Sequence, residues 1–327
     1  MTDPHGVHAL AIPTPFKVGR VNCYLIDDDP LTLVDAGPNS GTALTALEAK
    51  LGEHGRRIED LERIVLTHQH IDHIGLAQIL ADRSGADVVA LAALAPWLAT
   101  SETAMSLDDQ FAESVMLRNG VPHDVGIALR AVTEQYHAWG AAVQVTQPVS
   151  DGDLLEFADR SWRVLHRPGH SPSDTVFHDE ATGVLLGGDH LIKHISSNPL
   201  ITRPLGGGAP EDRPKALITY MASLTATRVL DLQTIYAGHG DPVEDHRTLI
   251  DDRFTATERR LEHIADILAA DGPKSGYEIA QEMWGNVAVT QAYLTLSEVL
   301  GHIDLLLERD EVVPVDDGDV LRFAPSS

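Results

Sequence analysis

Four residues that commonly bind metals fall within six positions of this chain, directly after an apolar segment. Ile64-Val65-Leu66 predicts a short buried strand, and Thr67-His68-Gln69-His70-Ile71-Asp72-His73 follows it at once. Imidazole and carboxylate groups suit Zn²⁺ and related divalent ions. If this segment is extended, His68 and His70 point to the same side, and Asp72 and His73 can reach a second ion nearby. The chain is therefore expected to place a strand end beside a metal site.

Three later segments place a histidine or an aspartate beside glycine, each after a predicted strand. They are Arg167-Pro168-Gly169-His170, Gly187-Gly188-Asp189-His190 and Ala237-Gly238-His239-Gly240. Glycine lets the backbone come close to a neighbouring group. A single histidine in such a place is usually only a turn residue. Because all three segments follow the first block in order, we expect His170, Asp189 and His239 to join it.

Strands alternate with helical patterns through most of the 327 residues, which predicts a layered α/β domain. The predicted strands are 7–12, 21–26, 31–34, 64–66, 88–91, 143–147, 153–157, 162–166, 174–178, 184–187 and 233–237. From about residue 245 the pattern becomes helical. The segments 312–315 and 320–323, on either side of Asp316-Asp317-Gly318-Asp319, predict a β-hairpin.

The combined motifs resemble those of the metallo-β-lactamase superfamily over about residues 5–245. The resemblance implies a four-layer αββα sandwich with a dinuclear site at one edge of two packed sheets. It implies that the first metal is bound by His68, His70 and His170, the second by Asp72, His73 and His239, and both by the bridging carboxylate of Asp189. The expected cofactors are two divalent ions per chain, Zn²⁺ first, with Fe and Mn compatible. The Val34-Asp35-Ala36-Gly37 turn also matches the family, as a support for the ligands.

A dinuclear site of this kind predicts a metal-dependent hydrolase. Two close ions lower the pKa of a shared water, so the nucleophile is a bridging hydroxide, which Asp72 would orient. The chain has no Gly-x-Ser-x-Gly segment, and its single cysteine, Cys23, falls in a predicted strand. True β-lactamases usually carry cysteine at the position of Asp189, so antibiotic hydrolysis is disfavoured. The favoured activity is glyoxalase II-like hydrolysis of a small-molecule ester or thioester.

Two alternatives remain open. A lactonase is one, although many lactonases of the superfamily carry tyrosine three residues after the bridging aspartate, where this chain has Ile192. The other is a single-strand endoribonuclease, because residues 246–327 resemble the winged-helix-like module of a β-lactamase-like branch. Charge argues against nucleic acid as a partner. The chain carries a net charge of −25, and residues 255–327 hold 14 acidic and 5 basic side chains.

The expected organisation is a catalytic domain at 1–245, with a helical insertion at about 94–139, followed by the module at 246–327. The insertion is either a packed helical pair or a lid over the site. The lid would present large side chains to a substrate: Trp97, Met105, Met116, Tyr136 and Trp139. The apolar face of a helix at 290–308 needs a cover, which the preceding helices or a homodimer partner would supply.

Two histidines near the predicted ligands are ambiguous. His190 follows Asp189, but adjacent side chains usually diverge, so a supporting role is preferred. His194 lies in the loop after the metal carboxylate and is a candidate for contact with substrate. A cytoplasmic protein is the default expectation. No apolar run is long enough to span a bilayer, and Met1–His5 has neither the basic region nor the apolar core of a signal peptide.

Overall fold

A computed structural model describes residues 6–326 of the chain, which divide into two compact units. Unit 1 comprises residues up to 105, 136–197 and 229–246. Unit 2 comprises residues 106–135, 198–228 and 247 onward. The segment Met1–His5, on which the expectation about a signal peptide rests, lies outside the described residues.

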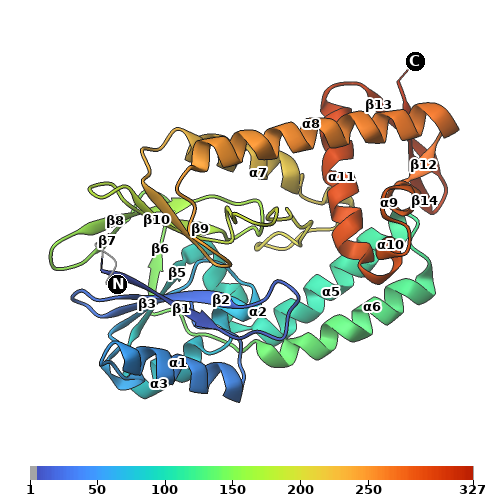
Figure 1. Cartoon of the computed structure of the whole chain (residues 1–327). Coiled ribbons are helices and arrows are strands. Elements are labelled where there is room, and N and C mark those ends of the chain that lie inside the picture. The colour runs from blue at the N-terminus through green and yellow to red at the C-terminus, as the bar shows by residue number, and fades with distance from the viewer. Residues whose placement is uncertain (1–5, 327) are drawn as a thin grey trace. The chain divides into compact units, whose positions relative to one another are not determined.

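Two β-sheets form the centre of unit 1 (Figure 1). The six-stranded sheet has the order β1-β2-β3-β4-β5-β6, and the five-stranded sheet has the order β11-β10-β9-β8-β7. The first sheet contains β1 (Val7–Ile12), β2 (Val21–Ile26), β3 (Thr32–Val34), β4 (Arg63–Val65), β5 (Asp87–Leu91) and β6 (Gln147–Val149). The second contains β7 (Leu154–Glu156), β8 (Ser161–His166), β9 (Thr175–Asp179), β10 (Val184–Gly188) and β11 (Thr234–Ala237).

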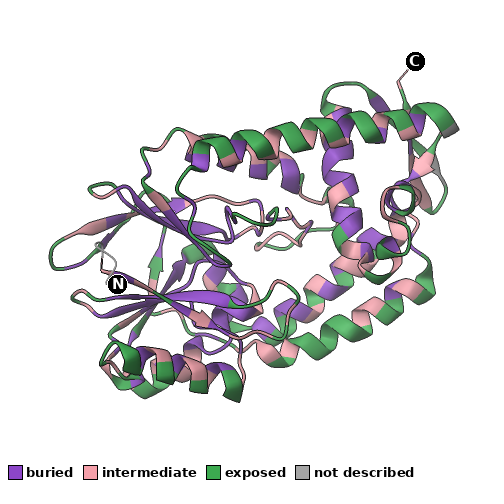
Figure 2. Ribbon diagram, viewed as in Figure 1, coloured by how far each residue is buried: buried purple, intermediate pink, exposed green. Residues whose placement is uncertain are grey.

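The core of unit 1 lies between these sheets. Apolar side chains such as Tyr24 and Val65 from the first sheet pack against Trp162, Phe177 and Leu186 from the second. Strands β2 and β10 are buried at every residue, and they appear in purple in Figure 2. This matches the continuous apolar runs in their sequences, which indicate strands covered on both faces. Helices α1 (Gly41–Glu53) and α3 (Ala77–Ser84) lie on the outer face of the six-stranded sheet (Figure 1).

Parallel pairing places the carboxyl ends of neighbouring strands at one edge of each sheet. β3, β4 and β5 run parallel, as do β10 and β11. The short helix α2 (Ile71–Ile74) begins six residues after β4 ends. All of the predicted metal-binding segments therefore follow strand ends, as in other open α/β sheets where sites form outside the carboxyl ends of strands.

Unit 2 has its own apolar core, built from helices and a small sheet. Its helices are most of α5 (Ser101–Arg118), α6 (His123–Tyr136) and α8 (His246–Asp271), together with α7 (Ala216–Arg228), α9 (Gly276–Trp284), α10 (Val287–Thr290) and α11 (Ala292–Glu308). Its sheet has the order β12-β14-β13, from β12 (Lys274–Ser275), β13 (Val312–Asp317) and β14 (Val320–Pro325). The predicted hairpin is present, and it follows α8, β12, α9, α10 and α11 in the chain.

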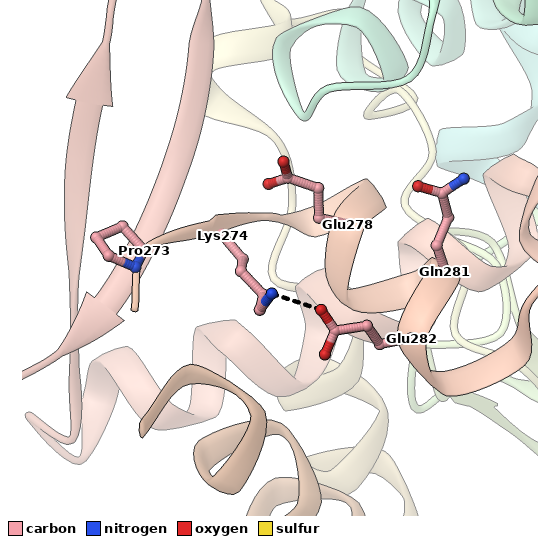
Figure 3. A pocket seen from close by; sticks show the side chains of 5 residues that line it. All are labelled: Pro273, Lys274, Glu278, Gln281 and Glu282. Atoms are coloured by element: carbon pink, nitrogen blue, oxygen red, sulfur yellow. Dashed lines mark ion pairs between the residues drawn. The ribbon is translucent and has the colours of Figure 1, made fainter. Parts of the chain in front are cut away.

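One shallow pocket of about 320 Å³ lies at the start of α9 in unit 2, lined by Pro273, Lys274, Glu278, Gln281 and Glu282 (Figure 3). Its charged groups already have partners within the protein. Lys274 Nζ lies 2.5 Å from Glu282 Oε1, and Glu278 accepts hydrogen bonds from the Arg322 guanidinium and the Ser275 backbone. The pocket contains none of the predicted site residues.

Neither compact unit is a single continuous stretch of the chain. Residues 106–135 and 198–228 group with the C-terminal segment rather than with the residues of the two large sheets. The physical reason is apolar packing, because Phe111 and Val115 of α5 and Ala216 of α7 share a buried cluster with Leu296 and Leu300 of α11. A strand expected at 143–147 is also misplaced, since β6 begins only at Gln147.

None of the described helices, which also include the short α4 (Ala95–Ala99), is long and apolar enough to cross a membrane.

Candidate metal centre

Ring nitrogens of three histidines meet at one point in unit 1. His68 follows β4, His70 immediately precedes α2, and His170 lies in the turn between β8 and β9. His70 Nδ1 lies 3.1 Å from His68 Nε2 and 2.9 Å from His170 Nε2. A tetrahedral ion with bonds of ~2.0–2.1 Å to nitrogen holds such ligands roughly 3.3 Å apart. These three nitrogens therefore have a spacing close to that of ligands on one ion.

Burial keeps two of these imidazoles neutral. It lowers the pKa of His68 well below its usual range, with the neighbouring His73 and His70 acting in the same direction. Burial, with His170 nearby, lowers the pKa of His70 to about 3. The neutral imidazole is the form that binds a metal.

A second group of ligand atoms comes from α2 and the end of β11. Asp72, His73 and His239 each offer an atom within 4.8 Å of the others, and all three are buried. His239 Nε2 lies 3.4 Å from Asp72 Oδ2. The first block is not extended throughout, because helix α2 begins at Ile71. Asp72 and His73 are consequently presented from the first turn of a helix rather than from an alternating loop.

The carboxylate of Asp189, at the end of β10, lies between the two groups. Its Oδ2 is 3.6 Å from His170 Nε2 and 3.4 Å from His239 Nε2, and its Oδ1 is 3.5 Å from His73 Nε2. The buried atoms Asp189 Oδ1 and His73 Nε2 have no hydrogen-bond partner among the described residues. A divalent cation would satisfy both atoms, so the donor set fits a metal site.

The electrostatic field of the site favours positive charge. Burial alone would raise the pKa of Asp189, but His73 and His239 hold it well below its usual range. Burial lowers the pKa of His239, yet hydrogen bonds to Asp189 and Asp72 raise it to about 9. The same carboxylates that favour a proton on His239 would favour a divalent cation, and the two compete for the imidazole nitrogen.

Asp35, in the turn after β3, contacts His73 and Thr67 on the side away from Asp189, which agrees with the supporting role expected of this turn. Its Oδ2 lies 2.7 Å from His73 Nδ1, and its Oδ1 accepts a hydrogen bond of 2.9 Å from the Thr67 backbone amide. Thr67 Oγ1 also lies 3.0 Å from His68 Nδ1. The backbone of Asp35 is left-handed, with φ 59°, a conformation that aspartate tolerates better than most residues. The buried Asp35 carboxylate thereby orients the imidazole of His73, a predicted ligand, through its second nitrogen.

His239 is positioned by Arg20, which directly precedes β2, and its turn by Asn22 of β2, and neither role was predicted from the sequence. Its Nδ1 lies 2.8 Å from the carbonyl oxygen of Arg20, which leaves Nε2 facing Asp72 and Asp189. The Asn22 side chain donates to the carbonyls of Ala237 at 3.1 Å and Gly240 at 2.8 Å. These contacts join residues more than 200 positions apart, so local spacing contains no signal for them.

A buried polar network joins the His170 turn to the first block. Asp174 accepts hydrogen bonds from the Ser171 amide at 2.9 Å and the Ser171 hydroxyl at 2.6 Å. The Ser173 hydroxyl bonds the Gln69 side chain, and it accepts from the Gln69 amide at 3.2 Å. Burial raises the pKa of Asp174 to about 6. Sequence reasoning missed this network, although the segment Ser171-Pro172-Ser173-Asp174 follows a predicted ligand directly.

Two glycines are required by close approach at the centre. A Cβ on Gly238 would lie 2.2 Å from Asp189 Oδ1 and 2.7 Å from His73 Cε1. A Cβ on Gly188, whose φ is +47°, would lie 2.7 Å from Thr67 Oγ1. The expectation that glycine permits close packing beside the ligands is met at both positions.

The two ambiguous histidines lie outside the ligand groups. His190 is fully buried, and burial together with Arg167 lowers its pKa to about 3. The exposed His194 has its ring against Gly240, since a Cβ there would lie 2.5 Å from His194 Nδ1. Cys23 is fully buried in β2, and burial raises the pKa of its thiol. It is therefore no nucleophile.

Part of the expected lid is core instead. Trp97, Met105 and Met116 are each no more than 9% exposed, and Met116 belongs to the apolar core of unit 2. They therefore pack rather than line a substrate pocket. Tyr136 is 41% exposed and Trp139 is partly exposed, so only these two of the five large side chains remain accessible.

Comparison with known proteins agrees with this geometry. A family model described as the metallo-beta-lactamase superfamily matches residues 16–239, which contain every predicted ligand. This chain belongs to the metallo-β-lactamase superfamily. It is 32% identical over 317 residues to the probable metallo-hydrolase YqjP of Bacillus subtilis, with 97% of each chain covered.

Two further matches agree with membership of the superfamily. The metallo-beta-lactamase family protein TTHA1429 from Thermus thermophilus has a crystal structure that matches with a TM-score of 0.80, 27% identity and 98% of each chain covered. Hydroxyacylglutathione hydrolase GloC of Haemophilus influenzae is 25% identical over 236 residues, which cover 69% of this chain and 88% of that protein. The match to TTHA1429 includes unit 2, so the C-terminal segments are a shared part of that architecture.

Proposed function

We propose that this superfamily member is a hydrolase that uses two divalent ions to cleave a small-molecule ester or thioester. The observation that carries the proposal is the Asp189 carboxylate, which lies within 3.6 Å of nitrogens from both ligand groups. Six further ligands surround it, more than one tetrahedral ion uses. Zn²⁺ is the preferred ion, and Fe or Mn also suits a set of histidines and carboxylates.

When bound, such a pair of ions forms a nucleophile near neutral pH by lowering the pKa of water, and it stabilises the developing oxyanion. The chain supplies a base beside that position. Burial raises the pKa of Asp72, but His73 and His239 outweigh it and keep the pKa below its usual value, so the carboxylate is ionised at neutral pH. Its Oδ2 faces His239, which leaves Oδ1 to accept a proton and to deliver it to the leaving group.

The substrate class follows from what the site offers. Cys23 is buried, so a nucleophile from water is preferred to a covalent one. GloC is named for hydrolysis of an acylated glutathione, a thioester, and its similarity favours a thioester over a β-lactam. Ile192 is only 2% exposed, so it supplies neither the hydroxyl nor the exposed surface of the tyrosine expected in a lactonase. We propose His194, exposed beside Gly240, as a contact for the substrate.

Nucleic acid is not the proposed substrate. Helix α11, the helix that would read a groove in a winged helix, is buried along most of its length in unit 2. Acidic side chains outnumber basic ones 14 to 5 over residues 255–327. A protein gains affinity for nucleic acid mainly by placing cations on phosphates, and this segment has few to offer.

The experiment loads purified protein with Zn²⁺, Mn²⁺ or Fe²⁺ and measures metal per chain together with turnover of an acyl thioester, an aryl ester, a lactone and a single-stranded RNA. We expect two equivalents of metal, with hydrolysis of the thioester or ester only. His170→Gln should lower both metal content and activity. The matched control is His166→Gln, because the His166 ring contacts the Pro172 carbonyl and lies outside the ligand groups. A single equivalent in the presence of excess metal, or cleavage of RNA alone, contradicts the proposal.

A further inference from the structure

Three aromatic rings form a cluster on unit 1 that the ligand framework does not require. Phe16 lies in the loop between β1 and β2, Tyr136 ends α6, and Trp139 ends the short 3₁₀ helix η3 (His137–Trp139). The Phe16 ring stands nearly perpendicular to the other two, at 5.7 Å from Tyr136 and 5.5 Å from Trp139, and the latter two rings are 5.4 Å apart. Together they make an apolar corner.

This aromatic corner is exposed to solvent, unlike the other large aromatic groups of unit 1. Tyr136 is 41% exposed, and Phe16 and Trp139 are both partly exposed, whereas Trp97 and Trp162 are at most 7% exposed. Contiguous exposed apolar surface usually marks a place where something binds. Partly exposed aromatic rings that contact one another form a rigid surface of this kind.

The Trp139 side of the corner is attached to the first ligand block. The Trp139 carbonyl accepts a hydrogen bond of 2.8 Å from the Asn39 amide, and a Cβ on Gly75 would lie 2.3 Å from the same oxygen. Gly75 is two residues beyond His73. A Cβ on Gly140 would lie 3.0 Å from the Ile71 side chain, which stands between two predicted ligands. The backbone that carries Trp139 therefore packs directly on the segment that presents the first block.

The Phe16 side of the corner is attached to the ligand at the end of β11. The loop closes on itself through a hydrogen bond of 3.1 Å from the Gly19 amide to the Phe16 carbonyl. The next residue, Arg20, uses its carbonyl to orient His239. The two sides of the corner are thus attached to the two segments that supply the second ligand group, α2 and the turn that carries His239.

We propose that Phe16, Tyr136 and Trp139 bind the apolar acyl chain of the substrate and so determine acyl-chain specificity. The inference rests on the proposed hydrolase function, because the acyl carbon must lie at the metal centre while its chain extends to a neighbouring surface. The corner is an exposed aromatic surface whose backbone also contacts α2 and orients His239. An acyl chain is chosen over a protein partner because the segments that carry the rings contact the segments that carry the predicted ligands.

The test compares two thioesters that share one thiol, with an acetyl or a decanoyl acyl group. The wild-type protein should prefer the decanoyl thioester. In Phe16→Ala and Trp139→Ala, kcat/KM for the decanoyl thioester should fall roughly 10-fold or more, because apolar contacts of this size discriminate between substrates by such factors. In the same variants, kcat/KM for the acetyl thioester should fall less than about two-fold. Leu154→Ala, which removes an apolar side chain 47% exposed on β7, is the matched control and should change neither.

Binding of decanoate supplies a readout that needs no turnover. Decanoate should change the tryptophan fluorescence of chelator-treated protein, acetate should not, and Trp139→Phe should remove most of the change. If decanoate binds in this way but neither thioester is hydrolysed by metal-loaded protein, the proposed function fails and the subsite stands. If both thioesters are hydrolysed but the variants lose both equally, or lose neither, the subsite is overturned and the hydrolase function stands.

Discussion

The Nδ1 atom of His73 lies 2.7 Å from Oδ2 of Asp35, and this contact turns the other ring nitrogen toward Asp189. Among the described residues, the other hydrogen bonds of the Asp35 carboxylate come from Thr67 and from no other predicted ligand. A carboxylate in this position fixes the tautomer of the imidazole and makes it a better ligand. The effect of Asp35 on metal affinity can therefore be measured while all of the predicted ligands are kept.

Replacing Asp35 by asparagine should weaken metal binding by ~10–100-fold without abolishing it, as removal of such supporting groups generally does. Competition with a chromophoric chelator measures the loss. Asp27→Asn is the matched control, because Asp27 forms an exposed ion pair with Arg56 and should leave affinity unchanged. Equal affinity in the two variants would show that Asp35 has no influence on the ligand.

Asp189→Ala should be far more damaging than His190→Ala. The Asp189 carboxylate contacts nitrogens from both ligand groups, whereas His190 lies outside them. We expect Asp189→Ala to lose at least one metal equivalent and roughly 100-fold or more in activity. His190→Ala should keep its metal, although loss of a fully buried side chain will lower its Tm. Comparable loss of metal in both variants would mean that His190 is a ligand.

Gly238→Ala should impair metal binding through sterics alone. The added Cβ would lie 2.2 Å from Asp189 Oδ1, so the carboxylate must move. Gly41→Ala is the control, since a Cβ there meets nothing within 4 Å at the start of α1. It should keep full metal content and be slightly stabilised, because alanine favours helices. Normal metal content in Gly238→Ala would refute the close approach.

The residues of the site that could be predicted are those with local signals. A buried strand followed by His68, His70 and Asp72 is recognisable within ten positions, and glycine marks the other ligand segments. Asn22 and the Arg20 carbonyl have no such signal, because they act on a loop more than 200 residues away. A backbone carbonyl can also come from any residue type, so its role leaves no trace in the sequence.

The same distinction applies to the fold. The apolar runs predicted β1 and β2 to the residue, and the other strands of the two large sheets, except β6, to within one residue at each end. The large side chains of the insertion were harder to assign. Met116 and Tyr136 fall in similar helical patterns, yet one is buried in a core and the other is exposed. Helical spacing shows which residues share a face, but only the packing partner decides whether that face is covered.

Asp174 should make stability fall as pH rises through the mildly acidic range. Burial raises its pKa in the folded protein from 3.8 to about 6, so the folded state binds more protons than the unfolded state between these values. The shift of about two units corresponds to roughly 3 kcal/mol lost between pH 4 and pH 6. In Asp174→Asn, the free energy of unfolding relative to wild type should therefore increase over that range and stay constant above it. Urea titrations of chelator-treated protein at each pH measure this, and a difference independent of pH would contradict the expected titration.

The stability of unit 2 should depend on a buried ion pair that lies outside the predicted metal site. Arg213 donates two hydrogen bonds of 2.7 Å to the carboxylate of Asp304, which is 3% exposed on α11. Asp304→Ala leaves the guanidinium of Arg213, a side chain only 14% exposed, without that partner and should cost about 3–5 kcal/mol. Asp251→Ala is the control, because its pair with Arg228 is exposed and its loss should leave Tm unchanged.

A double variant separates two causes of the lost stability: the unpaired buried charge of Arg213 and the loss of packing at Asp304. Replacing Arg213 by methionine and Asp304 by leucine removes both charges while keeping apolar volume, so most of the lost stability should return. Denaturant unfolding followed by far-UV circular dichroism measures all three variants with and without metal. The loss in Asp304→Ala should persist in the presence of metal, because every predicted ligand belongs to unit 1. A double variant as unstable as Asp304→Ala would show that the ion pair itself, rather than the avoidance of an unpaired buried charge, stabilises α11.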